Sequence, residues 1–233
     1  MRMEKNPYQE GRVLLIDKPL GWTSFKVVKK INYLLKGIKV GHAGTLDPLA
    51  TGLLILCTGK FTKRINKYMA AEKEYTGSFT LGATTQTYDL ESEPANFKEF
   101  SHISAENILS VFRQFTGNIQ QIPPAHSAIK KDGRRAYEMA RKGEEVNLAP
   151  RPITIRDFQL VRFDSPKVYF RVVCSTGTYI RSLAQDIGQA LGSGAYLSSL
   201  CRTRIGDFTL EHAMTIEEAE KEILQYRNIK TDN

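Results

Sequence analysis

The chain has 233 residues, of which 41% are hydrophobic, and a chain of this length and composition can bury roughly 70% of its extended-chain surface as an ordinary globular protein. Its 33 lysines and arginines outnumber its 25 acidic residues, and the net charge of +8 favours a polyanionic partner over an acidic or neutral one. Nucleic acid is the first candidate, and the alternative is a basic surface that only keeps the protein dispersed.

The cysteines and the N-terminal residues indicate a cytoplasmic protein without a membrane partner. Cys57, Cys174 and Cys201 are odd in number, widely spaced and set in apolar or strand-like surroundings, which predicts neither a disulfide framework nor a zinc site. The first eleven residues are polar, and no apolar run approaches the length needed to cross a bilayer.

The first elements are a short strand over residues 13–16 and a helix that runs from Thr23 or Ser24 to about Lys36, where Gly37 ends it. The helix buries an apolar stripe and carries several lysines on its remaining surface. The pattern favours a solvated face for these lysines over a binding surface.

Residues 41–54 hold three glycines and a proline, which predict an irregular loop without helix or strand across it. The loop runs into an apolar segment, residues 53–57, that reads as a buried strand. Because Pro48 restricts the backbone of the residue before it, the loop holds Asp47 in a fixed place. Alternatively, Asp47 only caps one helical turn that starts at Pro48 and ends at Gly52.

The remaining elements follow from periodicity and turn residues. They are a basic helix over 60–70, a strand over 73–81 with Tyr75 in its buried face, a polar loop over 82–102, a helix over 104–115, strands over 153–163 and 167–174, a helix to Leu191, a strand pair within 196–208, and a helix from Thr215 to about Tyr226. Arg181 falls in the first turn of the helix that ends at Leu191, where the macrodipole disfavours a cation, so we expect a compensating group such as a carboxylate nearby.

Residues 122–150 are loop-like and strongly basic, with six basic side chains between residues 130 and 142 and an aromatic residue among them. Such a segment suits a lobe that tracks phosphates while a ring packs or stacks. An exposed hairpin explains the same residues equally well. Because no internal repeat or long linker is visible, we expect one domain over residues 1–233 with this segment as an insertion.

Five sequence blocks carry a further pattern. In chain order they are Asp17-Lys18-Pro19 with Gly21-Trp22-Thr23-Ser24, the loop from Gly41 to Gly52, Lys73 and Tyr75 with Leu81-Gly82, Thr85, Thr87 and Asp89, then Ser127-Ala128-Ile129-Lys130 with Gly133 and Tyr137, and last Gly177-Thr178-Tyr179-Ile180-Arg181. With these blocks the chain resembles the TruB family of tRNA pseudouridine synthases over about residues 11–210.

The resemblance implies an α+β pseudouridine synthase fold with a central, mostly antiparallel mixed sheet flanked by helices and a basic RNA-gripping insertion. It also implies the activity, which is the isomerisation of uridine-55 in the T-loop of tRNA to pseudouridine. This reaction cuts the N1–C1′ bond and joins C5 of the uracil to the same sugar carbon without a redox change, so no cofactor or metal is expected. One carboxylate can serve as nucleophile at the sugar carbon or as base at C2′, and the sequence leaves both open.

The resemblance also assigns site residues. Asp47 would be the catalytic carboxylate, Arg181 the cation that keeps it ionised, and Tyr75 the ring that stacks on the uracil, while His42 would support the loop bases after the target is extruded. Tyr75 and His42 are alternatively packing residues. The further RNA-binding residues implied are Lys18, Thr45, Lys73, Tyr179, Lys130, Lys131, Arg134, Arg135, Arg141 and Arg202.

Many bacterial relatives carry a C-terminal RNA-binding domain of the PUA type, and the few residues after Phe208 are too short for one, so we expect a short form. The expected partner is the T-arm stem-loop of tRNA, bound by a monomer that needs no protein partner. Two rival functions share these features. A tRNA-binding module without chemistry would have no need of Asp47, and a nucleoside glycosidase would release free uracil and usually needs a second carboxylate.

Overall fold

The computed structural model describes residues 6–131 and 133–229, and the chain divides into two compact units. Unit 1 comprises Met1–Tyr75 and Cys201–Asn233, and unit 2 comprises Thr76–Leu200. Two strands, β4 (Lys73–Leu81) and β10 (Ala195–Ile205), pass from one unit into the other.

The sheet of unit 1 is built around β3 (Ala50–Thr58), nearly all of which is buried. β1 (Val13–Lys18) and β2 (Val40–Ala43) both pair with β3 in antiparallel register. The end of β10 follows β3 in the strand order, and β11 (Phe208–Thr209) pairs with β10. The strand over residues 13–16, the buried strand over 53–57 and the strand pair within 196–208 that the sequence predicts are therefore present.

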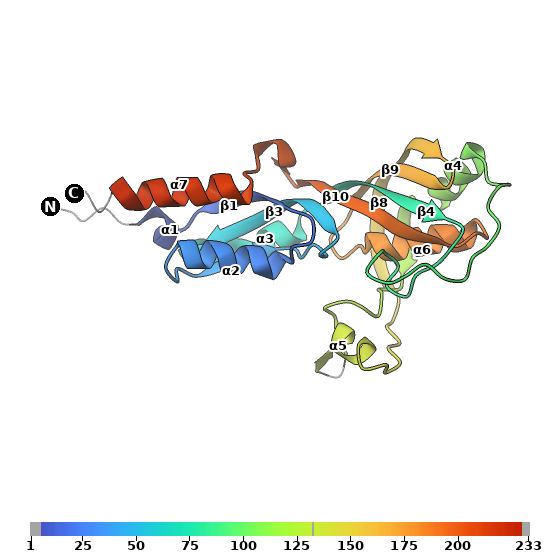
Figure 1. The fold of residues 1–233 in the computed structure, drawn as a ribbon, viewed down its shortest axis with the longest axis horizontal. Helices are drawn as coiled ribbons and strands as arrows, with labels where there is room; N and C mark the ends of the chain where they lie inside the picture. The colour runs from blue at the N-terminus through green and yellow to red at the C-terminus, as the bar shows by residue number, and fades with distance from the viewer. Residues whose placement is uncertain (1–5, 132, 230–233) are drawn as a thin grey trace. The chain divides into compact units, whose positions relative to one another are not determined.

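Helices cover both faces of this sheet (Figure 1). On one face, α2 (Ser24–Leu34) and α7 (Ile216–Ile229) share a core with Leu54 and Leu56 of β3. On the other face, side chains of the 3-10 helix η1 (Gly59–Arg64) and of α3 (Ile65–Ala70) pack against Leu53 and Ile55. Two short helices, α1 (Pro7–Glu10) and the 3-10 helix η2 (Leu210–His212), complete the unit.

Unit 2 continues the strand order as β10, β4, β9 (Lys167–Cys174), β8 (Arg151–Asp164) and β5 (Gly117–Gln121). Helices α4 (Ala105–Gln114) and α6 (Ile180–Ala190) each bury one apolar stripe. Aromatic rings form a cluster in this unit, where Phe112 stacks on Phe158 with ring centroids 3.7 Å apart and Phe170 meets Phe158 edge-on.

The segment 122–150 contains a small hairpin of β6 (Lys130–Lys131) and β7 (Arg134–Arg135), followed by the short helix α5 (Ala136–Ala140). Figure 1 shows α5 standing away from the strands of unit 2. The exposed hairpin that the sequence allowed is thus present. Its basic side chains are also consistent with the other interpretation, a lobe that binds phosphates.

Three of the predicted helices begin where the sequence predicts, and a side chain caps the start of each. The Thr23 hydroxyl accepts from the amide of Lys26 at the start of α2, and Ser104 forms a capping box with Asn107 at the start of α4. Thr215 and Glu218 exchange the two bonds of a second capping box at the start of α7. Residues 82–102 contain neither helix nor strand, as predicted.

One prediction was wrong. Residues 41–54 are not irregular throughout, because β2 extends to Ala43 and β3 begins at Ala50. Pairing along β2 and β3 offsets the conformational cost of the glycines at positions 41 and 52, so only residues 44–49 lie outside the strands. Among the described residues, no helix combines the length and the apolar character required to span a bilayer.

Candidate active site

Asp47 lies in the six-residue loop that joins β2 to β3, and its side chain is partly exposed. The amide of Ala50 donates to the carbonyl oxygen of Asp47 at 3.1 Å, so the chain turns back into β3 directly after Pro48 and Leu49. This arrangement is a turn at the tip of a hairpin and not the capped helical turn that was the alternative. A carboxylate is therefore presented at the end of two paired strands.

Ser24, at the first position of α2, holds the loop by hydrogen bonds to the backbone of Leu46. Its hydroxyl accepts from the amide of Leu46 at 2.8 Å and lies 3.1 Å from the Leu46 carbonyl oxygen, and it is buried. Because Thr23 already caps the helix, the Ser24 hydroxyl is available for the loop. The residue immediately before Asp47 is thus bound at both of its backbone polar groups.

Lys18, at the end of β1, also binds the loop, at the carbonyl oxygen of Pro48. Its fully buried ammonium donates to the carbonyl oxygens of Trp22 at 2.5 Å, Pro19 at 3.0 Å and Pro48 at 3.4 Å. Burial lowers the pKa of Lys18 to about 8, and the Asp47 carboxylate opposes that shift. Lys18 supports the loop that carries Asp47, and direct RNA binding by Lys18 stays a prediction.

We expect a Lys18→Met variant to show a pH-dependent difference in stability from the wild type. Lys18 releases its proton near pH 8 in the folded protein but near its ordinary value of 10.5 in the unfolded chain. Between these values the unfolded chain holds more protons, so the stability of the wild type rises relative to the variant, by roughly 2 kcal/mol from pH 7 to pH 10. Urea unfolding of both proteins at the two pH values measures this, with Lys221→Met as an exposed control. A constant difference would contradict it.

Arg202, on β10, links the first residue of the loop to β3. Its side chain is 1% exposed, and it donates from Nε to the carbonyl oxygen of Leu53 at 2.8 Å and from Nη2 to that of Gly44 at 3.0 Å. Gly52 allows this close approach because a Cβ there would lie 2.4 Å from the carbonyl oxygen of Arg202. Arg202 therefore positions the loop, and its predicted contact with RNA is untested.

His42 and Thr45 lie on the same hairpin as Asp47. His42 Nε2 is 3.1 Å from the hydroxyl of Thr45, which is exposed. Burial lowers the pKa of His42, and the charge of Arg202 lowers it further, so the neutral imidazole is favoured. A neutral ring beside an exposed hydroxyl can donate or accept hydrogen bonds with a nucleobase without attracting phosphate nonspecifically.

Arg181 occupies a second site, in unit 2, and a carboxylate compensates it as predicted. That carboxylate is Asp89, whose Oδ2 lies 3.5 Å from Arg181 Nε, and both side chains are buried. The guanidinium also donates to the carbonyl oxygens of Thr87 at 3.0 Å and His126 at 3.1 Å. The predicted pairing of Arg181 with Asp47 stays a prediction.

Asp89 was not among the residues assigned to the site. It lies in the long polar loop, and its Oδ1 accepts from the hydroxyl of Thr87 at 2.6 Å and from the amide of Glu91 at 3.0 Å. Tyr179 immediately precedes α6, and its backbone exchanges two hydrogen bonds with the buried amide side chain of Gln121. The start of α6 is therefore fixed at Tyr179 and at Arg181.

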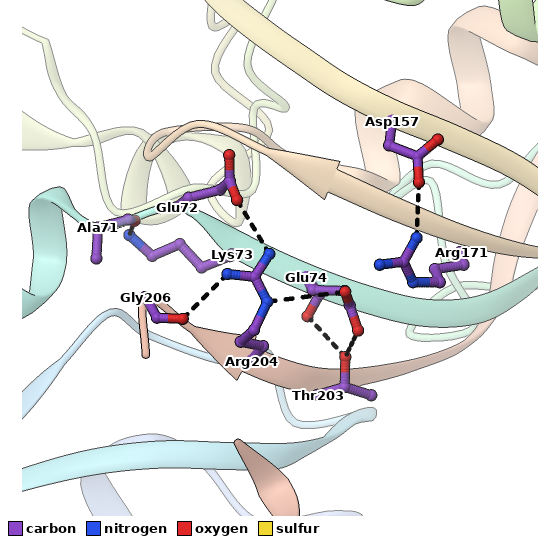
Figure 2. Close-up of polar contacts among 9 residues, drawn as sticks. All are labelled: Ala71, Glu72, Lys73, Glu74, Asp157, Arg171, Thr203, Arg204 and Gly206. Atoms are coloured by element: carbon purple, nitrogen blue, oxygen red, sulfur yellow. Dashed lines mark hydrogen bonds and ion pairs between the residues drawn. The ribbon is translucent and has the colours of Figure 1, made fainter. Parts of the chain in front are cut away.

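Tyr75 and Lys73 lie on β4 and are both buried. Lys73 donates to the carbonyl oxygens of Met69 and, at 2.6 Å, of Ala71, so its ammonium binds the C-terminus of α3. Figure 2 shows the Lys73 side chain directed at Ala71. Stacking by Tyr75 on the uracil and RNA binding by Lys73 remain predictions. Within unit 1, Lys73 stabilises the end of α3.

Nearby, Arg204 of β10 anchors the start of β4. Its Nη2 lies 3.0 Å from Glu72 Oε1 and its Nε lies 3.8 Å from Glu74 Oε2. Figure 2 shows the guanidinium between these two carboxylates. These are part-exposed pairs, which contribute modestly to stability.

The basic side chains of the insertion are mostly exposed. Lys130, Arg135 and Arg141 are exposed, and Arg134 pairs with Glu144 at 2.6 Å, which neutralises part of its charge. The side chain of Lys131 lies outside the described part of the structure. The segment is tied to α6, because the Ser182 hydroxyl donates to the carbonyl oxygen of Ile122 at 2.9 Å.

The fold is that of the pseudouridine synthases. In a search of solved structures, the chain superposes on the crystal structure of a Cbf5-Nop10-Gar1 complex with a TM-score of 0.73, 32% identity and 92% coverage of this chain, while spanning 54% of the matched chain. A structure of an H/ACA RNP bound to a substrate RNA containing 2′-deoxyuridine gives a TM-score of 0.71 at 29% identity, with 96% of this chain and 56% of that chain covered. The present chain thus spans little more than half of either.

Sequence comparison then defines the family. The model described as TruB family pseudouridylate synthase (N terminal domain) matches residues 30–180, and the tRNA pseudouridylate synthase B C-terminal domain matches residues 181–233. The chain belongs to the TruB family of pseudouridylate synthases and is therefore an isomerase.

Two curated relatives match this chain along nearly its whole length. The tRNA pseudouridine synthase B of Flavobacterium johnsoniae is 53% identical over 221 residues, which cover 92% of this chain and 96% of that protein. The tRNA pseudouridine synthase B of Bacteroides thetaiotaomicron is 50% identical over 235 residues, covering 97% and 98%.

Proposed function

We propose that this isomerase converts uridine-55 in the T-loop of tRNA to pseudouridine, with Asp47 as the reacting carboxylate. The relatives named tRNA pseudouridine synthase B support tRNA as the substrate. The observation that carries the catalytic assignment is the hairpin tip, where Asp47 is partly exposed while its neighbours in the loop are bound by Ser24, Lys18 and Arg202.

The reaction needs one carboxylate and no external reagent. The N1–C1′ bond of uridine breaks, the uracil turns and C5 bonds to C1′. The proton on C5 then leaves to solvent while N1 takes up a proton, so the product is an isomer of the substrate. Asp47 either attacks C1′, forming a covalent ester that the uracil later displaces, or removes the C2′ proton and returns it. Atoms and electrons balance on either route, so we propose that the enzyme works without cofactor or metal.

A fixed carboxylate suits this chemistry because the base becomes detached during the reaction. A catalytic group held in one place avoids the entropic cost of orienting it at each turnover. The cut uracil must also be kept from escaping, and we assign this role to the ring of Tyr75, which can stack on it. Arg181, held by Asp89 and two carbonyl oxygens, would supply a fixed positive charge to the same reaction.

The target uridine must leave the folded T-loop before a carboxylate can reach it, at a cost of a few kcal/mol that other contacts must offset. We propose that His42 and Thr45 contact the loop bases, and that Lys130, Arg135 and Arg141 of the insertion bind phosphates. We further propose that the two units act as one catalytic domain, and that the protein works on tRNA in the cytoplasm as a monomer.

The position of the modification can be tested with tRNA labelled with tritium at C5 of uridine. We expect the wild type to release close to one tritium per tRNA, and to release none above background from tRNA in which uridine-55 is replaced by cytidine. Equal release from the substituted tRNA would overturn the proposed position. Tight binding without release would indicate a binding module, and free uracil among the products would indicate a glycosidase.

A further inference from the structure

A second basic surface lies on α2, outside the loop and the insertion. We propose that the α2 ridge, formed by Trp22, Phe25, Lys26, Lys29 and Tyr33, binds the phosphate backbone of the T-arm next to the T-loop. This proposal rests on tRNA being the substrate. The lysine pattern alone favoured a solvated face, and the structure adds two observations that favour binding.

The first observation is that this face carries two exposed rings, Phe25 and Tyr33, and that each lysine contacts an aromatic ring, which for Lys26 is the partly buried Trp22. Phe25 is 60% exposed and Tyr33 is 79% exposed, so α2 presents two large rings to solvent away from its buried face. The Lys26 ammonium lies 4.1 Å from the centre of the Trp22 ring, and the Lys29 ammonium lies 4.9 Å from that of Phe25. Lysines held in this way lose less side-chain entropy when they bind an anion.

The helical spacing places these residues together. Phe25, Lys29 and Tyr33 follow one another at intervals of four residues, so they form one stripe along α2, with Lys26 beside it. The helix contains no acidic residue over Ser24–Leu34. Lys30, on the flank of the stripe, is already paired with Glu220 of α7 at 2.7 Å, whereas Lys26 and Lys29 have no carboxylate partner within residues 6–131 and 133–229. The exposed charge of the ridge is therefore positive throughout.

The second observation is that the ridge is continuous with the loop that carries Asp47. α2 begins at Ser24, whose hydroxyl binds the residue before Asp47, and the helix then extends for roughly 16 Å. Successive phosphates along each strand of an RNA stem are only a few ångströms apart, so a stem that has its loop at Asp47 and extends along α2 would bring phosphates to the ridge. The positive charge of the ridge and its continuity with the loop both favour RNA as its partner. The test below distinguishes RNA from a second copy of this chain.

The test is the binding of a T-arm minihelix to a Lys26→Gln/Lys29→Gln variant, measured from 0.05 to 0.2 M salt. We expect Kd at 0.1 M salt to rise about tenfold, and the slope of log Kd against log salt to fall by about 1.5, because each phosphate that a lysine neutralises adds roughly 0.7 to 0.9 to that slope. A Lys98→Gln/Lys221→Gln variant, which removes two exposed lysines elsewhere, should change Kd less than twofold. Phe25→Leu should weaken binding two- to threefold without changing the net charge.

Several outcomes would overturn the ridge. Equal effects of the two double variants would show that only net charge matters, and an unchanged salt slope would exclude phosphate contacts. If Phe25→Leu instead converts a dimer into a monomer in sedimentation, the face binds a second copy. Because Kd is measured without turnover, the ridge is tested separately from the proposed function. A wild type that binds the minihelix but forms no pseudouridine would refute only the latter.

Discussion

Replacing Gly52 with alanine should lower the free energy of unfolding by about 4 kcal/mol or more and abolish pseudouridine formation with it. Gly52 lies in β3 with φ at +97°, a conformation that alanine adopts only at a cost. A Cβ at this position would also lie 2.4 Å from the carbonyl oxygen and 2.8 Å from the amide nitrogen of Arg202, and 2.9 Å from Cys201 Sγ. Two of these three atoms are backbone atoms, so β3 and β10 would have to separate.

Gly37→Ala separates the steric clash from the backbone strain. Gly37 also has a positive φ, of +83°, but an added Cβ there would meet nothing within 4 Å. Strain alone should cost about 1 to 2 kcal/mol, so urea unfolding should show a much smaller loss of stability for Gly37→Ala than for Gly52→Ala. Equal losses would mean that the close approach of Gly52 to Arg202 does not matter. A stable Gly52→Ala protein with full activity would show that the loop tolerates displacement.

Local elements could be predicted because their signals lie within a few residues of each other. Thr23 and Ser104 cap their helices, and Thr215 pairs with Glu218, because these bonds depend on residues three positions apart. The strand over Lys73–Leu81 follows from alternation in the same way. The family also followed from the sequence, since blocks in order identify it without any knowledge of packing.

The hairpin around Asp47 shows what local reasoning could not provide. The glycines at positions 41 and 52 suggest an irregular chain, yet both lie in strands because β3 and its neighbours pair along their length. The resemblance implied that Lys18 and Arg202 bind RNA, which stays a prediction. The sequence did not show that both side chains are buried against carbonyl oxygens of the loop. The bond from Lys18 to Pro48 joins residues 30 positions apart, and the bond from Arg202 to Gly44 joins residues 158 positions apart. Such bonds depend on tertiary structure, so no spacing in the sequence indicates them.

The surroundings of Arg181 could be predicted only in part. A cation in the first turn of a helix breaks a local rule, and this correctly indicated a nearby carboxylate. Which carboxylate it is could not be read from the sequence, because Asp89 lies in a loop without periodicity, more than ninety residues earlier. An acid within the long polar loop, close to Thr85 and Thr87 in one of the sequence blocks, was the signal that could have singled out Asp89.

Asp47→Asn should lower the rate of pseudouridine formation by at least about 10⁴-fold while leaving tRNA binding within a few-fold of the wild type. An amide has nearly the shape of a carboxylate, so the hairpin should fold unchanged, but it neither attacks C1′ effectively nor accepts a proton from C2′. Asp207→Asn, at an exposed position in the turn between β10 and β11, removes the same charge from unit 1 and should keep full activity. Loss of folding in Asp47→Asn would show up in the circular dichroism spectrum.

The most direct measurement is single-turnover release of tritium from C5 of uridine in a T-arm minihelix, with enzyme in excess over RNA so that every substrate is bound. The wild type and Asp207→Asn should release the label completely, and Asp47→Asn should release none above background from RNA that it demonstrably binds. If Asp47→Asn releases tritium at a rate near that of the wild type, the carboxylate at the tip of the β2–β3 hairpin is not the reacting group.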